Sequence, residues 1–286
     1  MKIQEMNLHN KNSYCIDYDI TQSCNNRCPY CCVMDDLDNT KIFNEKVFEQ
    51  VISAVNSFKH RDSICVTLLG GDPLLIPFKV HEFVERIKCN VTIYSNLNYN
   101  PLSDNIQIAK KLDANFINSW HSSSNIKYVK DNILLLRDRI KPILMVDNTN
   151  IDEMFENSKW LIEQDINYSV QFIRNKKDAV LIDTHNEKVK EMCTYAIPNS
   201  SNTIDGVLYN DIESLDMDLL NIAMRHKVLC RLYMIRVLFN GELKPLCNNP
   251  IQLGHIENGL SFHEILCSGN NCLCDTRNYK RILNVS

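Results

Sequence analysis

The strongest constraint on the fold is a regular alternation of apolar strand-like segments and amphipathic helix-like segments, which continues to about residue 175. The first strand-like segment covers residues 14–20, and the first helix-like segment covers residues 44–60 with Asn44 as a suitable N-cap. Further strands are predicted at residues 64–69, 91–94, 115–118, 142–146 and 168–173, and further helices at 78–88, 103–112, 125–138 and 152–164. Because a helix separates each strand from the next, the pattern predicts a parallel sheet with right-handed crossovers. Six such units are too few for an eight-stranded barrel, so we expect an α/β fold built as a partial (β/α)6 TIM-like barrel.

The alternation ends after Arg174. The polar residues that follow predict a bridging segment with one or two helices, and the cysteine-bearing, turn-rich end of the chain predicts a small extension. Its clearest element is a hairpin in which residues 234–239 precede an Asn240-Gly241 turn. The predicted division is a barrel core at residues 1–175, a bridging segment at 176–229 and a cysteine-rich extension at 230–286.

The composition is that of a globular protein, with 44% hydrophobic and 23% charged residues. A net charge of −4 provides no overall attraction to nucleic acid or to an anionic membrane. No apolar run approaches the roughly 20 residues of a membrane helix, and the N-terminus lacks the apolar segment of a secretory signal. The sequence therefore predicts a cytoplasmic protein without a membrane partner.

Cysteine is unusually frequent, with 13 residues among 286. Without an export signal, such cysteines indicate metal binding or catalysis rather than disulfides. Cys24, Cys28 and Cys31 lie on the loop that follows the first predicted strand. Three thiolates on one loop can hold an iron–sulfur cube and leave one iron open for a further ligand. A zinc knuckle is the alternative, although no second Cys/His pair lies close by in the sequence to complete it.

The spacing C-x3-C-x-aromatic-C resembles the signature of the radical S-adenosylmethionine (SAM) superfamily, and the resemblance covers residues 14–175. It implies that Cys24, Cys28 and Cys31 ligate a [4Fe–4S] cluster whose open iron binds the methionine part of SAM, with Tyr30 near the adenine. In this family the reduced cluster splits SAM into methionine and a 5′-deoxyadenosyl radical, which takes hydrogen from the substrate. An electron donor such as flavodoxin or ferredoxin is implied as a partner.

Further segments resemble the SAM site of that family, and all of them follow predicted strands, where barrels collect their active sites. The resemblance assigns SAM contacts to the loop Gly70-Gly71-Asp72-Pro73, in which Asp replaces the usual Glu, to the pair Ser95-Asn96, and to Ser119 or Ser122. His121 is either a substrate contact or acid–base group, or a loop histidine without a role. Cys193 either returns a hydrogen atom to a substrate radical or is a buried structural residue.

A second cysteine group resembles the start of the C-terminal extensions called SPASM and twitch domains. Its pattern is Cys230, Gly241 and Cys247 followed by Cys267, Cys272 and Cys274. The resemblance implies one auxiliary [4Fe–4S] cluster, held by Cys230, Cys247 and two of the three later cysteines. A structural zinc site is the alternative.

The resemblance implies a ribosomally made peptide as the substrate, modified by crosslinking, epimerisation or oxidation. No peptide-recognition domain precedes Cys24, so either a separate recognition protein or a non-peptide substrate is expected. The alternatives are the same radical chemistry on a nucleoside, a DNA base or a small metabolite, for which the locally basic residues 222–286 are the only support, and a non-catalytic zinc-binding interaction protein.

Overall fold

A computed structural model describes the barrel core almost completely and parts of the C-terminal region. The described residues are 3–4, 14–28, 31, 36–58, 64–173, 186–196, 228–231, 234–245, 253–260, 264–267 and 280–283. None of the helices within these ranges has both the length and the hydropathy needed to span a lipid bilayer.

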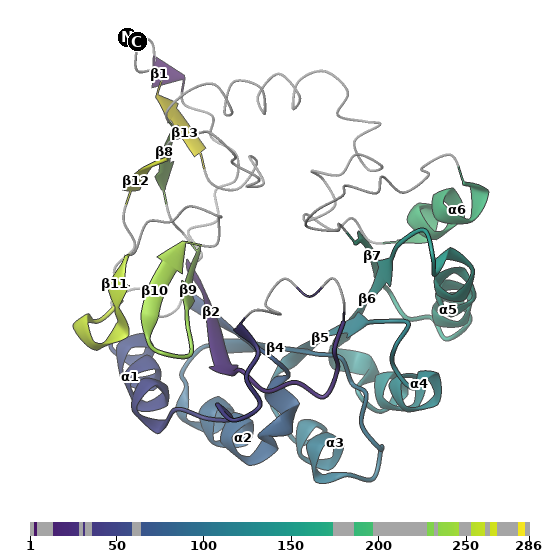
Figure 1. The fold of residues 1–286 in the computed structure, drawn as a ribbon, viewed down its shortest axis with the longest axis horizontal. Coiled ribbons are helices and arrows are strands. Elements are labelled where there is room, and N and C mark those ends of the chain that lie inside the picture. The colour runs from purple at the N-terminus through teal and green to yellow at the C-terminus, as the bar shows by residue number, and fades with distance from the viewer. Residues whose placement is uncertain are drawn as a thin grey trace.

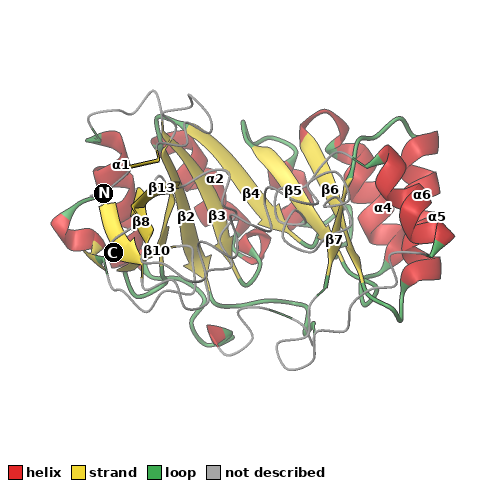
Figure 2. Ribbon diagram, turned by 90° about the horizontal axis from the view of Figure 1, so that it is seen from above, coloured by secondary structure: helices red, strands yellow, loops and turns green. Residues whose placement is uncertain are grey.

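Six parallel strands alternate with helices in the core, as the sequence predicts (Figure 1). The strands are β2 (Tyr14–Thr21), β3 (Ile64–Gly70), β4 (Asn90–Ser95), β5 (Asn115–Trp120), β6 (Ile140–Val146) and β7 (Ser169–Phe172). The helices between them are α1 (Glu45–Asn56), α2 (Pro77–Arg86), α3 (Asp104–Ala109), α4 (Ile126–Leu135) and α5 (Ile151–Glu163). Short 3-10 turns precede α2 and β6, at Pro73–Leu75 (η3) and Arg137–Arg139 (η4). The strands lie side by side in chain order and the sheet does not close, so the prediction of a partial barrel is confirmed (Figure 2).

Helix α1 shows why these residues form the predicted elements. The Asn44 side chain accepts a hydrogen bond from Val47 N at 3.3 Å, which confirms the expected N-cap. The apolar residues at helical spacing form one buried face, which includes Phe48. The ring of Phe48 packs against Phe83 of α2, and Phe83 in turn packs against Tyr18 of β2.

The two faces of the sheet differ in chemistry. On β4, Val91 and Ile93 are buried, while Thr92 and Tyr94, which alternate with them, are only half-buried. Because successive strand residues point to opposite faces, the apolar set faces the helices and the more polar set lines the concave side. Figure 1 shows α1 to α5 around the outside of the curved sheet.

The core sheet continues beyond β2 through C-terminal strands. Strand β9 (Met234–Val237) pairs in parallel with β2, and β10 (Glu242–Pro245) and β11 (Gly254–His255) follow in antiparallel orientation. The predicted hairpin around Asn240-Gly241 is therefore confirmed. A short 3-10 turn, η7 (Ile256–Asn258), follows β11. The sequence predicted this hairpin as part of the C-terminal extension. In the structure its strands are hydrogen-bonded to the core sheet.

A second sheet has four strands in the order β1-β13-β8-β12. It contains β1 (Ile3–Gln4), β8 (Val228–Arg231), β12 (Glu264–Cys267) and β13 (Lys280–Leu283). Strand β1 pairs with β13, so the two ends of the chain meet in this sheet (Figure 1). In the predicted bridging segment, the structure describes one helix, α6 (Glu187–Tyr195), which packs beside α5.

Candidate functional site

The cysteine loop follows β2 at the carboxyl end of the sheet. Cys28 is buried, while Cys24 and Cys31 are half-buried. Cys31 N donates to Cys28 O at 3.0 Å, and Asn26 N donates to Cys24 Sγ at 3.4 Å. Burial, together with negative charge on Asp72, Cys28 and Cys31, raises the pKa of Cys24 to about 11. Negative charge on any one of these groups therefore disfavours the thiolate form of Cys24, and a cationic partner would be needed to stabilise that thiolate.

The number of thiols on the loop bears on the kind of metal site. A closed structural zinc site takes four protein ligands. Three thiols suffice for an iron–sulfur cube that keeps one iron open, so the donor set of the loop fits such a cluster.

The loop from Gly70 to Pro73 lies directly against the stem of the cysteine loop. Gly71 N donates to Thr21 O at 2.9 Å, and Asp72 N donates to Ser23 O at 2.8 Å. A Cβ atom on Gly70, whose φ is 123°, would lie 2.0 Å from Thr21 O, and one on Gly71 would lie 1.8 Å from Ser23 O. The two glycines are therefore required for this close backbone contact.

Asp72 connects three loops from inside the protein. Its side chain is only 1% exposed and accepts hydrogen bonds from Leu74 N at 3.0 Å, Ser95 Oγ at 3.0 Å and Asn96 N at 2.9 Å. Burial raises the pKa of Asp72 to about 6, although these hydrogen bonds oppose the rise. The carboxylate expected to contact SAM thus holds the Ser95-Asn96 loop in place, and Pro73 starts the turn beneath it.

Asparagine side chains tie the loop after β4 to the cysteine loop. Asn96 Nδ2 donates to Asn25 Oδ1 at 2.7 Å and lies 4.0 Å from Cys24 Sγ. Asn98 Nδ2 donates to Asn26 Oδ1 at 3.0 Å. The sequence analysis identified Asn96 as a site residue but missed Asn25, Asn26 and Asn98. The only available signal was the concentration of asparagine beside the first cysteine and after β4.

The loop after β5 reaches the same place. Asn26 Nδ2 donates to Ser124 Oγ at 3.4 Å, and Ser124 N donates to His121 O at 3.0 Å. Burial lowers the pKa of His121 to about 4, so the imidazole is neutral at pH 7. Ser119 lies half-buried on β5 in register with Ile143 of β6. The structure therefore brings Ser119 and His121 to the carboxyl end of the sheet, as the sequence predicts.

Other predicted site residues lie elsewhere or outside the described ranges. Cys193 on α6 packs against the hydrophobic core, where burial raises its pKa to about 11, and the structure does not bring it to the cysteine loop. Cys230 on β8 pairs in register with Ile265, and Cys267 pairs with Val228. Tyr30, Cys247, Cys272 and Cys274 lie outside the described residues.

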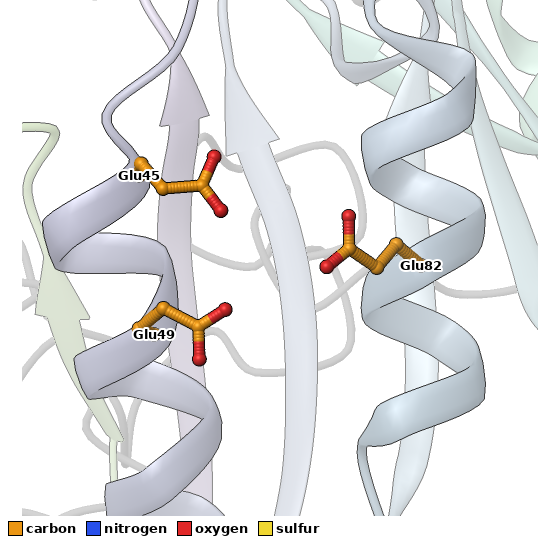
Figure 3. Close-up of side chains that lie close together, drawn as sticks. All are labelled: Glu45, Glu49 and Glu82. Carbon is orange, nitrogen blue, oxygen red and sulfur yellow. The ribbon is translucent and has the colours of Figure 1, made fainter.

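One acidic group lies on the helical surface. Glu45 and Glu49 of α1 face Glu82 of α2 (Figure 3). Lys79 Nζ lies 3.1 Å from Glu45 and 2.9 Å from Glu82, while Arg86 lies 2.6 Å from Glu49 and 2.8 Å from Glu82. The two cations already pair with these carboxylates, so the cluster is an ion-pair network between helices.

Comparisons with known proteins assign the family. The family model described as the radical SAM superfamily matches residues 18–173. No curated protein matches the sequence. Among solved structures, native anSMEcpe with bound AdoMet has a TM-score of 0.56 and 15% identity over 85% of this chain and 78% of its own.

Two further solved structures share the fold. Native anSMEcpe with bound AdoMet and the Cp18Cys peptide has a TM-score of 0.51 and 16% identity over 85% of this chain and 77% of its own. Streptococcus suis SuiB bound to S-adenosylmethionine has a TM-score of 0.55 and 14% identity over 86% of this chain and 64% of its own. At these identities the structures establish the fold, while the family model covers more than half of the sequence. The chain belongs to the radical SAM superfamily, and it is therefore an enzyme of that superfamily.

Proposed function

We propose that Cys24, Cys28 and Cys31 bind a [4Fe–4S] cluster and that the enzyme uses SAM to modify a ribosomally made peptide. The observation that supports this most directly is the close backbone contact between the Gly70-Gly71 loop and the stem of the cysteine loop. That contact fixes the start of the cysteine loop relative to β3, where this family binds SAM.

The residues present fit the cluster and SAM. Three thiols provide soft ligands, and their number suits a cube that keeps one iron open. Because burial raises the pKa of Cys24, the positive charge of the iron is what favours its thiolate. When bound, the cluster supplies one electron that splits SAM and produces a radical able to take hydrogen from a C–H bond.

The side chains around the loop position this chemistry. Asp72 holds Ser95 and Asn96 from below, and Asn96 holds Asn25 beside Cys24. We propose that the backbone of Gly70 and Gly71 and the side chains of Ser95, Asn96, Ser119 and Tyr30 line the SAM site. Their shared task is to fix the orientation of SAM and to exclude water.

A peptide substrate is supported by the solved structures with the same fold, since native anSMEcpe is known with the Cp18Cys peptide bound. Crosslinking, epimerisation and oxidation all begin with the removal of one hydrogen atom. Flavodoxin or ferredoxin is the proposed electron donor, and a separate recognition protein is a proposed partner.

We also propose one auxiliary [4Fe–4S] cluster in the C-terminal region. The register of β8 with β12 places Cys230 and Cys267 on neighbouring strands, two positions out of alignment. Strand β10 ends at Pro245, two residues before Cys247. These placements support Cys230, Cys247 and Cys267 as three of the four ligands, with Cys272 or Cys274 as the fourth.

The test is to replace Cys24, Cys28 and Cys31 together by alanine and to measure iron content and 5′-deoxyadenosine release from SAM under dithionite. We expect loss of the radical-generating cluster and of 5′-deoxyadenosine. Cys89→Ala, which removes a half-buried thiol outside the loop, is the matched control. Unchanged release in the triple variant would disprove the proposal. Deuterium transfer from labelled peptides, nucleosides or small metabolites into 5′-deoxyadenosine then identifies the substrate class.

A further inference from the structure

Three cysteines gather at the amino end of the barrel, away from the cysteine loop. Cys15 lies near the start of β2, Cys65 lies near the start of β3, and Cys89 comes just before β4. The stretch of extended chain from Cys15 to Thr21, where β2 ends, spans about 20 Å. A reaction at these thiols would therefore take place at the opposite end of the barrel from the proposed SAM site.

Cys15 and Cys65 face each other on neighbouring strands. The two residues are directly opposite in the parallel register of β2 with β3. Their neighbours Ile16 and Val66 are buried in the core, so both thiols lie on the concave side of the sheet. Neighbouring strands are about 4.8 Å apart, and the Cα atoms of a disulfide are usually about 4.4–6.8 Å apart, so the strand spacing suits a bond between these two sulfurs.

The two thiols differ in how readily they ionise. They share a side-chain hydrogen bond, which lowers the pKa of Cys65 and, together with burial, raises the pKa of Cys15. Burial and the charge of Asp17 oppose ionisation of Cys65, but its pKa stays below the ordinary value. Cys15 Sγ also lies 3.7 Å from Thr67 Oγ1. Because the thiolate is the reactive form, Cys65 is the nucleophile of the pair.

The pair is open to small molecules. Both thiols are half-buried rather than buried. Asn90, which is opposite Cys65 in the register of β3 with β4, is exposed, so this end of the sheet borders solvent. Cys89 is a poorer partner for Cys65, because it packs against the hydrophobic core and burial raises its pKa to about 11.

We propose that Cys15 and Cys65 form a redox-active thiol pair that a hydroperoxide converts into a disulfide. The Cys65 thiolate attacks the O–O bond and becomes a sulfenic acid, and the oxygen that leaves takes up the proton that Cys65 lost. The Cys15 sulfur then attacks the Cys65 sulfur, and the S–S bond forms as the hydroxyl group leaves as water with the Cys15 proton. The two thiols lose two electrons, which the hydroperoxide gains. The inference is independent of the proposed function, because no step involves the cysteine loop or SAM.

The test treats the anaerobically reconstituted full chain with a series of hydrogen peroxide concentrations. Free thiols are then alkylated under denaturing conditions, and mass spectrometry of the digest identifies disulfide-linked peptides. Cys15→Ser and Cys65→Ser each remove one sulfur and retain a small polar side chain, and dimedone traps the sulfenic acid that each variant forms. Cys89→Ala is the matched control, because it removes a half-buried thiol at the same end of the barrel. Thermal melting confirms that each variant is folded.

We expect the wild type and Cys89→Ala to give the peptide linked through Cys15 and Cys65, and each serine variant to lack it. Dimedone should label Cys65 in Cys15→Ser at least about tenfold more than Cys15 in Cys65→Ser, because the thiolate is the form that reacts. Absence of the linked peptide from the wild type at every concentration, its loss in Cys89→Ala, or equal labelling of the two serine variants would overturn the inference.

Discussion

Arg236 on β9 donates three hydrogen bonds to the carboxylate of Asp19 on β2, from Nε at 2.9 and 3.1 Å and from Nη2 at 2.9 Å. The two residues are 217 positions apart in the sequence. The pair joins the strand that leads into the cysteine loop to the hairpin that lies between Cys230 and Cys247. The charges of two distant parts of the chain therefore fix their relative position.

Removal of one partner should destabilise the protein strongly. We expect Arg236→Ala to lower the free energy of unfolding by about 3–5 kcal/mol, because it leaves the Asp19 carboxylate buried without its cation. Burial already raises the pKa of Asp19, and loss of Arg236 raises it further, so the folded state holds the proton more tightly than the unfolded state. The loss should grow as pH rises above the usual range of aspartate. Urea unfolding at pH 5 and pH 8 measures both effects.

The double variant Asp19→Asn/Arg236→Leu separates charge from packing. With both charges removed, it should be less destabilised than Arg236→Ala at pH 8. A double variant that is as unstable as the single one would show that packing, rather than charge, accounts for the effect.

Asp72→Asn should change how stability depends on pH. The pKa of Asp72 is raised by burial to about 6, so the folded state binds a proton more tightly than the unfolded state between pH 4 and pH 6. The wild type should therefore lose about 3 kcal/mol relative to Asp72→Asn as pH rises through that window. Chemical denaturation across that pH range checks this, and a constant difference would contradict the raised pKa.

His121 should change the pH dependence of stability in the direction opposite to that of Asp72. Because burial lowers its pKa to about 4, the folded state resists protonation that the unfolded state accepts near pH 6.5. The wild type should lose stability relative to His121→Gln as pH falls from about 6.5 to 4. The same denaturation series on His121→Gln measures this, and parallel curves for the two proteins would count against burial of the imidazole.

Gly71→Ala should disturb the cysteine loop more than the barrel. A Cβ atom at this position would lie 1.8 Å from Ser23 O and 2.9 Å from Cys24 N, so the stem of the loop must move. We expect at least about a tenfold loss of 5′-deoxyadenosine formation, because a small misplacement of reacting groups costs on the order of a hundredfold. Iron content and product release are the measurements.

Gly259→Ala is the control for that variant. Gly259 has a φ of 84° and open space around its Cβ position, so alanine introduces backbone strain without a collision. It should cost about 1–2 kcal/mol of stability and leave 5′-deoxyadenosine formation intact. Equal losses in the two variants would mean that the glycine contact has no special role.

The sequence predicted the six core strands because their apolar periodicity and spacing are local properties. The cysteine spacing and the Gly70-Gly71 loop are local as well, so they were also recognised. The pairing of β9 with β2 was not predicted, because it depends on residues more than 200 positions apart, and no local pattern specifies a partner. The asparagine network was missed for a related reason. Asn25 and Asn98 form their hydrogen bonds only when the cysteine loop and the loop after β4 come together in the fold.

The meeting of β1 with β13 sets an order of events for a chain made from its N-terminus. Residues 3–4 are made long before their partner strand, and they can pair fully only after residue 283 has been added. The barrel strands, which pair with near neighbours in the sequence, can form much earlier. The C-terminal sheet that includes β1 is therefore expected to form after the barrel strands, because its first strand waits for a partner made much later in the chain.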